Sequence, residues 1–229
     1  MKQRFFITGT DTDVGKTFCA SALLYLAQQR GLSCLGLKPV AAGCEDEHST
    51  EAGELRNTDA LSLMQYSSIK LPYEQVNPVA LSRFLSPHLA AELENQQLTV
   101  TRLMQGCKTG LETSAQLTLV EGAGGWYVPI NSQETLAEFA AELGAPVILV
   151  IGLQLGCINH SLLTVEAIER SGLKLAAWIG NTIDPSMEEK DRNIATLSER
   201  LNAPCLGVVP RADCVEHAAL HLDLSALLA

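Results

Sequence analysis

Short apolar runs rich in β-branched residues alternate along the chain with segments whose apolar residues return every three or four positions. Each run predicts a β-strand, at residues 4–8, 34–40, 117–120, 146–151, 175–180 and 204–209. Between the runs, helical spacing predicts helices with one buried stripe each. Two such stripes are Ala20, Leu23, Leu24, Ala27 and Leu136, Phe139, Ala140, Leu143. Regular alternation of strands and helices predicts an α/β fold with a doubly wound, mainly parallel sheet.

The pattern also suggests how the chain is divided. Residues 146–151 are almost continuously apolar, which is typical of a strand buried on both faces. We find no internal repeat, low-complexity tract or linker in the 229 residues. The polar stretch 43–58 interrupts the pattern and predicts a mobile loop near the site rather than a boundary. We therefore expect a single domain over residues 1–229.

The first strand is followed by GTDTDVGKT at residues 9–17, the layout of a nucleotide-phosphate loop. Backbone N–H groups at the start of the next helix face an anion, Lys16 can reach the outer phosphates, and the Thr17 hydroxyl can bind magnesium. Gly9 and Gly15 lie one residue further apart than in the pattern G-x-x-x-x-G-K-[ST]. The alternative is an ordinary glycine-rich turn with a surface lysine. A strand before the loop and a helix after it favour phosphate binding.

Two further strand ends carry charged residues, and ligands of open α/β sheets gather at such ends. Lys38 and Pro39 close the second strand, and the alternative is a lysine that simply leaves the sheet edge. Glu121 closes the third strand before Gly122, where a carboxylate suits magnesium and glycine allows close approach to a ligand. Here the alternative is a tight turn with a solvated glutamate.

Two later strand ends are less specific. Asn181-Thr182-Ile183-Asp184 has the N-x-x-D form of a guanine reader without its usual lysine, and a plain turn before Pro185 fits equally well. The loop at 155–161 predicts a glycine turn and then a helix capped by Asn159 or Ser161, whose free N–H groups could take a carboxylate. Cys157 at this helix start lacks an identifiable partner base, so we do not expect a nucleophile there. Trp126, Tyr127 and Trp178 are expected to be packing residues, and His217 and His221 surface residues.

Composition narrows the possible partners and compartment. Sixteen Lys and Arg against 26 Asp and Glu give a net charge of −10, which disfavours nucleic acid as a ligand. Seven cysteines without a C-x-x-C pair argue against a disulfide framework or a zinc site and fit reduced thiols. Residues 1–8 are too short for a signal peptide, and no apolar run approaches the roughly 20 residues of a spanning helix. We expect a soluble, cytoplasmic protein without membrane contact.

Seven segments together resemble the dethiobiotin synthetase family: GTDTDVGKT (9–17), KPVAAG (38–43), RNTDA (56–60), VNPVAL (76–81), SPH (86–88), VEGAGGW (120–126) and LGCINH (155–160). The resemblance runs from the first strand to the last. It implies a homodimeric P-loop protein that closes the ureido ring of dethiobiotin from 7,8-diaminononanoate, carbon dioxide and ATP. It also implies Mg²⁺ as the cofactor and a carbamic-phosphoric anhydride as the intermediate.

Carried over residue by residue, the resemblance implies that Lys16 and Lys38 are catalytic and that Thr17, Asp59 and Glu121 surround the metal ion. ATP would contact Asp13, Val14, Gly15, Lys16, Thr17, Phe18, Asp59, Glu121, Gly122, Ala123, Gly124, Asn181, Thr182, Pro210, Arg211 and Ala212. The diamine would contact Thr12, Lys38 and Ala42, and its carboxylate would meet Leu155, Gly156, Cys157, Ile158 and Asn159 across the dimer interface. Replacing Lys16 or Lys38 by Gln is expected to reduce turnover by orders of magnitude and leave the fold intact.

Four residues depart from frequent choices of the family. Ala42 stands where serine is common and Asp13 where glutamate is common, and Arg211 and Thr182 also differ, so the nucleotide preference stays open. Two alternative functions remain. A partition or scaffold type of switch ATPase shares a deviant phosphate loop, although its early lysine is absent from residues 10–14. A related amide-forming ligase shares the acyl-phosphate chemistry.

Overall fold

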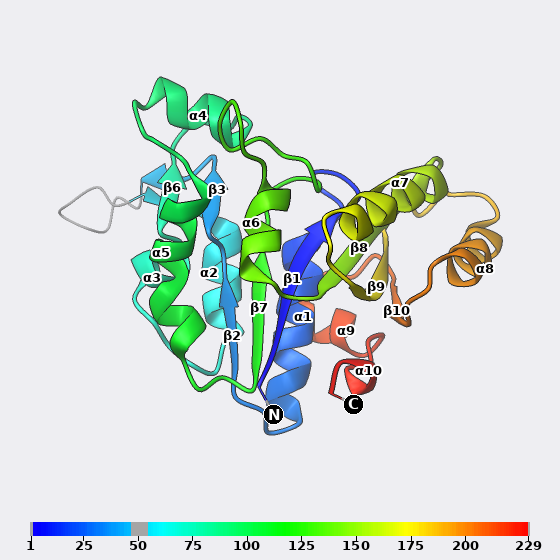
Figure 1. Ribbon diagram of the computed structural model, residues 1–229. Coiled ribbons are helices and arrows are strands. Elements are labelled where there is room, and N and C mark those ends of the chain that lie inside the picture. Colours follow the sequence, from blue (N-terminus) through cyan, green and yellow to red (C-terminus); the bar gives the residue numbers. More distant parts are fainter. Residues whose placement is uncertain (1, 47–54, 229) are drawn as a thin grey trace.

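The computed structural model describes residues 2–46 and 55–228, and a six-stranded parallel sheet runs through the middle of the molecule (Figure 1). The strand order is β10-β9-β8-β1-β7-β2, and every neighbouring pair is parallel. The bounds are β1 Gln3–Gly9, β2 Cys34–Leu37, β7 Leu117–Glu121, β8 Val147–Leu153, β9 Leu175–Thr182 and β10 Cys205–Val209. The predicted α/β class is confirmed.

Helices cover both faces of the sheet, and each face has its own apolar cluster. One cluster receives α1 (Lys16–Gln29), α2 (Thr58–Gln65), α9 (Val215–Ala219) and α10 (Ser225–Leu228). The other receives α5 (Val100–Glu112), α6 (Leu136–Leu143), α7 (Cys157–Arg170) and α8 (Lys190–Arg200). Alternation within β1 explains the two layers, since Phe5 and Ile7 enter one cluster and Phe6 the other. Both predicted helical stripes are buried, as burial of an amphipathic face requires.

The predicted strand 34–40 is wrong in its extent, because the chain leaves the main sheet at Lys38. β2 ends at Leu37, and Val40–Ala42 forms β3, which pairs in parallel with β6 (Val79–Leu81) in a separate small sheet. Pro39 has no N–H to donate to a ladder, so it interrupts the strand at this point. Two short helices, α3 (Tyr73–Val76) and α4 (Pro87–Leu93), lie in the same part of the chain.

The predicted loop 43–58 contains regular structure in its described part. Glu45–Asp46 forms β4, which pairs antiparallel with β5 (Leu55–Arg56), and α2 begins two residues later. Residues 47–54 of this loop lie outside the described residues. The ladder brings the two flanks of the loop together beside the start of α2.

Two local predictions need correction. Tyr127 is 56% exposed and is not a packing residue, whereas Trp126 and Trp178 are buried as predicted. Helix α7 begins at Cys157 after Gly156, whose φ of 98° is left-handed, so neither Asn159 nor Ser161 caps it. The Ser161 hydroxyl instead donates to the Cys157 carbonyl from inside the helix.

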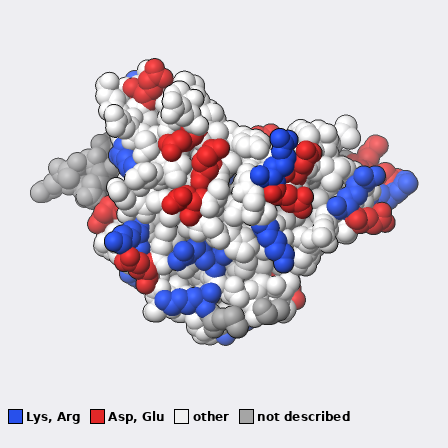
Figure 2. Space-filling model, in the orientation of Figure 1, with Lys and Arg blue, Asp and Glu red and all other residues white. Residues whose placement is uncertain are grey.

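The surface of the molecule carries both signs of charge. Acidic and basic side chains are interspersed on the face that Figure 2 shows. His217 and His221 are exposed, as predicted. Of the helices in residues 2–46 and 55–228, none has the length and apolar character needed to cross a membrane.

Candidate active site

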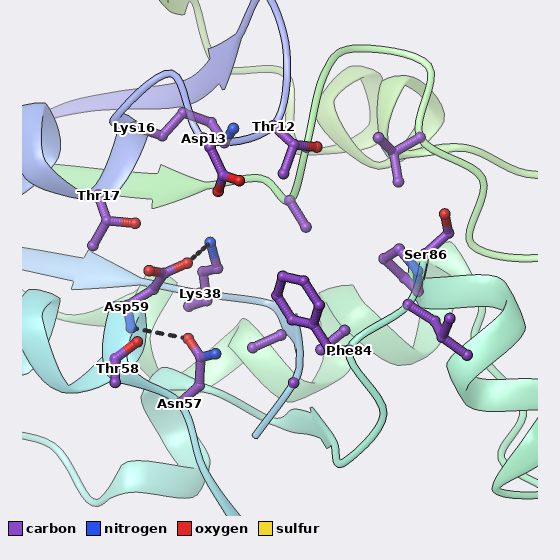
Figure 3. A pocket seen from close by; sticks show the side chains of 18 of the residues that line it. Thr12, Asp13, Lys16, Thr17, Lys38, Asn57, Thr58, Asp59, Phe84 and Ser86 are labelled. Atoms are coloured by element: carbon purple, nitrogen blue, oxygen red, sulfur yellow. Dashed lines mark hydrogen bonds and ion pairs between the residues drawn. The ribbon is translucent and has the colours of Figure 1, made fainter. Parts of the chain in front are cut away.

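A cavity of about 680 Å³ opens beyond the carboxyl ends of β1, β2 and β7 (Figure 3). The loop after β1, the end of β2, the start of α2, the segment after β6 and the loop after β7 supply its walls. The lining residues are Thr12, Asp13, Gly15, Lys16, Thr17, Lys38, Ala41, Ala42, Gly43, Asn57, Thr58, Asp59, Phe84, Leu85, Ser86, Pro87, Ala123, Gly124 and Val128. Segments distant in sequence thus meet where parallel sheets bind ligands.

The loop after β1 has the shape of an anion cradle. Gly15, with φ of 85°, precedes α1, whose first residue is Lys16, so the free N–H groups of the helix start point toward the cavity side of the loop. Asp13 also adopts a positive φ of 57°, and its side chain points into the cavity in Figure 3. The Lys16 ammonium group donates to the Asp11 carbonyl at 2.9 Å and thus folds over the loop. This geometry supports phosphate binding over an ordinary glycine-rich turn.

Lys38 lies between carboxylates at the bottom of the cavity. Its Nζ donates to Glu121 Oε1 at 2.6 Å and to the Gly122 carbonyl at 3.1 Å, and it pairs with Asp59 Oδ2 at 2.8 Å. Only 3% of the Lys38 side chain and none of the Glu121 side chain is exposed. Burial on its own would lower the pKa of Lys38, but Glu121 and Asp59 outweigh it and raise that pKa. Lys38 is therefore a fixed positive charge, and Glu121 is not a solvated turn residue.

Three oxygen-bearing side chains surround this lysine. The Thr17 hydroxyl donates to Glu121 Oε1 at 2.6 Å, and Asp59 lies beside both Thr17 and Lys38. Burial would raise the pKa of Asp59, but the Lys38 charge and the hydrogen bond from Lys38 outweigh it and lower that pKa. Asp59 therefore favours the ionised form that a cation would meet.

The donor set fits one small divalent ion. Glu121 Oε2 is buried and has no hydrogen-bond partner among the described residues, although an unpaired buried acceptor is costly. No group of three or more His, Cys, Asp or Glu in residues 2–46 and 55–228 is arranged to hold a metal. Two carboxylates and a hydroxyl beside a phosphate loop are instead typical of Mg²⁺, which completes its shell with water and phosphate oxygens.

Lys16 and Lys38 lie close enough to influence one another. Burial lowers the pKa of Lys16 to about 8, and the positive charge of Lys38 adds to the decrease, while Glu121 and Asp59 oppose it. Both lysines line the same cavity. Two cations near a phosphate loop are suited to stabilise negative charge on a transferring phosphoryl group.

The sequence reasoning gave no site role to several residues of the cavity wall, among them Asn57 and Phe84. Asn57 caps α2, and its side-chain oxygen accepts from the N–H groups of Asp59 at 3.0 Å and Ala60 at 3.3 Å. An Asn just before a helical segment is a capping signal, so Asn57 could have been found. Phe84 is 83% exposed and faces the cavity in Figure 3. No local sequence motif predicts that this side chain lines a site.

Five of the expected ATP contacts, Asn181, Thr182 and residues 210–212, lie at the carboxyl ends of β9 and β10 and do not line the cavity. Asn181 donates from Nδ2 to the Val14 carbonyl at 2.9 Å, which ties β9 to the phosphate loop. Thr182 Oγ1 is buried without a partner among the described residues. The register pairs Val209 with Asn181, so residues 210–212 follow β10 at the same edge. Asp184 accepts from the backbone and hydroxyl of Ser186, which makes N-x-x-D a turn here.

The remaining expected contacts separate into two groups. Ala42, Ala123 and Gly124 line the cavity, and the Gly122 carbonyl contacts Lys38, whereas Phe18 is half-buried in α1. The segment 155–159 does not line the cavity of its own chain, and Leu155 in it is 92% exposed. Burial raises the pKa of the Cys157 thiol, so the structure does not favour a nucleophile there.

Comparison with solved structures shows the fold. The signal recognition particle receptor FtsY from Elizabethkingia anophelis superposes with a TM-score of 0.57 at 12% identity, over 100% of this chain and 64% of that one. The septum site-determining protein MinD complexed with Mg-ADP from Pyrococcus horikoshii gives 0.57 at 14% identity, over 96% and 86%. The family model described as AAA domain matches residues 3–219. The fold and the phosphate loop define a P-loop nucleotide-binding protein of the α/β class.

Sequence relatives narrow this class. Proteins named ATP-dependent dethiobiotin synthetase BioD are 55% identical in Cellvibrio japonicus, over 99% of this chain and 98% of the relative, and 50% identical in Pseudomonas aeruginosa, over 97% of both. The relative of this name from Yersinia pestis is 44% identical over 100% and 97%. The chain belongs to the ATP-dependent dethiobiotin synthetase family.

Proposed function

We propose that this chain is an ATP-dependent cyclo-ligase that converts 7,8-diaminononanoate, CO₂ and ATP into dethiobiotin, ADP and phosphate, a step of biotin synthesis. One observation carries the proposal at the level of the site: Lys16, Thr17, Lys38 and Asp59 line one cavity beside the phosphate loop, and the buried Glu121 contacts Thr17 and Lys38 from behind. Full-length similarity to proteins named dethiobiotin synthetase supports the choice of substrates.

The reaction needs ATP because a carbamate is a poor electrophile. One amine attacks CO₂, a C–N bond forms, and a proton is lost to give the carbamate. A carbamate oxygen then attacks the γ-phosphorus, and the bond to the bridging oxygen breaks with its electron pair leaving on ADP. The second amine attacks the carbonyl carbon of this anhydride, the five-membered ring closes, and phosphate leaves as the amine loses a proton.

The two lysines supply positive charge where the reaction develops negative charge. Lys16, which starts α1, is suited to the outer phosphates, and Lys38 lies deeper, toward Glu121. Because carboxylates hold Lys38 protonated, it can face both the γ-phosphoryl group and the carbamate as a fixed cation. Holding both amines near one carbon makes the closing attack intramolecular, for which effective molarities are very large. The residues thus position and stabilise rather than react covalently.

For the cofactor, we propose that Thr17, Asp59 and Glu121 hold Mg²⁺, and the unpartnered Glu121 Oε2 supports this assignment. When bound, Mg²⁺ neutralises charge on the phosphate oxygens. For the nucleotide base, we propose Asn181, Thr182 and residues 210–212, supported by their place at the strand ends beside the phosphate loop.

We further propose a homodimer in which Leu155–Asn159 of the partner subunit receives the substrate carboxylate. Two observations support it. Residues 155–159 are absent from the cavity of their own chain, and three large side chains near α7 are exposed, with Leu155 at 92%, Leu163 at 58% and Tyr127 at 56%. We also propose that residues 1–229 form one domain. We propose a cytoplasmic location as well, and this is supported by the seven cysteines, all of which are free.

The proposed function is tested by measuring phosphate release from ATP, Mg²⁺ and bicarbonate with and without 7,8-diaminononanoate. We expect release that depends on the diamine, equimolar dethiobiotin by mass spectrometry, and loss of both in Lys16→Met, which keeps a side chain of similar length. Release that ignores the diamine, or that a protein partner or lipid vesicles stimulate, would favour the switch ATPase. Release that depends on a carboxylate substrate and an amine, without bicarbonate, would favour the amide-forming ligase.

A further inference from the structure

Behind the cavity, buried hydrogen bonds connect the backbone of Lys38 with the start of α2. Asn77 Nδ2 donates to the Lys38 carbonyl at 2.7 Å and to the Val79 carbonyl at 3.2 Å. The Tyr73 hydroxyl donates to Asn77 Oδ1 at 2.8 Å and accepts from the Asn57 N–H at 2.8 Å. Asn57 in turn caps the helix that carries Asp59. Hydrogen bonds therefore link Lys38 to Asp59 by a second route, besides their direct ion pair.

The members of this connection have little freedom. Tyr73, Asn77 and Asn57 are all buried, at 8%, 2% and 7% exposure. The Tyr73 hydroxyl uses its one proton on Asn77 and a lone pair on Asn57, so its removal would leave a buried donor and a buried acceptor unpaired. The Arg56 guanidinium lies over the Tyr73 ring, 4.5 Å from its centroid, and Lys38 N–H donates to the Val76 carbonyl at 2.8 Å. The ring and the backbone on both sides of it are thus fixed.

We infer that Tyr73 and Asn77 are positioning residues, which set the separation of Lys38 and Asp59 without touching the substrates. Neither residue lines the cavity, whereas Lys38, Asn57 and Asp59 do. A misplacement of about 1 Å from a change far from the chemistry can cost about 10²-fold in rate. The side chain of Lys38 is held by Glu121, and this connection and the ion pair both join Lys38 to the start of α2. The inference rests on the proposed roles of Lys38 and Asp59.

The first test is Tyr73→Phe, which removes one hydroxyl and keeps the ring beneath Arg56. We expect kcat to fall about 10-fold to 100-fold, the KM for ATP to stay within about twofold, and the Mg²⁺ concentration for half-maximal rate to rise. Tyr25→Phe is the matched control, since Tyr25 is half-buried on α1 and its ring packs edge-on against Tyr66. The control should keep kcat within about twofold.

A double-mutant cycle separates positioning from general stability. If Tyr73 acts through Asp59, then Tyr73→Phe should reduce kcat far less in an Asp59→Asn background than in the wild type. Asn77→Asp tests the other half of the connection, because it keeps the acceptor for Tyr73 and loses the donor to Lys38. We expect a similar fall in kcat for this variant. Each rate is divided by the concentration of protein that binds nucleotide, so that unfolded protein does not affect the comparison.

Three results would overturn the inference: a kcat within twofold of wild type for Tyr73→Phe, additive effects in the cycle, or a change confined to thermal stability or to KM for ATP. Wild-type turnover in the same assay tests the proposed function, whereas the ratio of variant to wild type tests the positioning role. The two failures are therefore distinguishable.

Discussion

Replacing Lys38 by Met should destabilise the fold as well as stop the reaction. Lys38 is 3% exposed and contacts Glu121, which is fully buried, so the variant leaves a carboxylate inside the protein without its cation. Met has a similar length and no charge. The burial changes the expectation from the sequence that a Lys38 variant would leave the fold intact.

The size of the effect follows from the burial of both partners. Removing one partner of a buried ion pair costs about 3–5 kcal/mol. The free energy of unfolding of a whole domain is only about 5–15 kcal/mol, so this cost is a large part of it. Replacing both partners removes the unpaired charge, and such replacements are often neutral. Lys38→Met combined with Glu121→Met should therefore return to within about 1 kcal/mol of wild type. Asp59 is 41% exposed and can turn to water.

The assay is urea denaturation at pH 7 for the wild type, both single variants and the double variant. We expect the two single losses to exceed the loss in the double variant, with a coupling free energy of at least about 2 kcal/mol. The slope of free energy against urea should stay constant across the four proteins. Additive losses, or a loss below about 1 kcal/mol for Lys38→Met, would refute the account of a buried pair.

Three further predictions concern ligands. The Lys16 pKa is about 8 in the free protein, and bound phosphates should raise it. Binding of Mg-ATP should therefore take up about half a proton at pH 8 and about a tenth of a proton at pH 7. Calorimetry in buffers of different ionisation enthalpy measures this uptake, and a binding enthalpy that does not depend on the buffer would contradict the prediction. Phe84→Ala should raise the KM for the diamine about 10-fold, because it removes an apolar part of the cavity wall. The control is Leu220→Ala, which removes a similarly exposed side chain near the C-terminal end of the chain. Equal KM values for the two variants would contradict a role of Phe84 in binding the diamine. Leu155→Asp should raise the diamine KM by repelling its carboxylate, whereas the isosteric Leu155→Asn should not, and an unchanged KM in both would reject the carboxylate site.

The parts of the site that sequence predicts best are those built from neighbouring residues. The phosphate loop follows directly from β1 and α1, because the strand, the Gly15 turn and Lys16 are contiguous. The burial stripes of α1 and α6 are equally local. The residue types of Asn181 and Thr182 left their role open, and the structure shows Asn181 engaged with the phosphate loop.

The parts that sequence misses depend on distant contacts. Asn77 bonds to Lys38 across 39 positions, and no periodicity encodes that contact. The break between β2 and β3 was missed because apolar residues lie on both sides of Lys38 and Pro39. Tyr127 was assigned to packing by residue type alone, although a large aromatic ring does not by itself specify burial. Asp59 was found only through family resemblance. It lies in α2, and this helix of eight residues is too short to give a clear periodic pattern in the sequence.

The most direct test of the central claim is a crystal structure with Mg²⁺, a non-hydrolysable ATP analogue and 7,8-diaminononanoate. The account predicts that both Lys16 and Lys38 contact the γ-phosphoryl group and that the cation contacts Thr17, Asp59 and Glu121. A γ-phosphoryl group beyond the reach of Lys38, or a cation held by other residues, would contradict it.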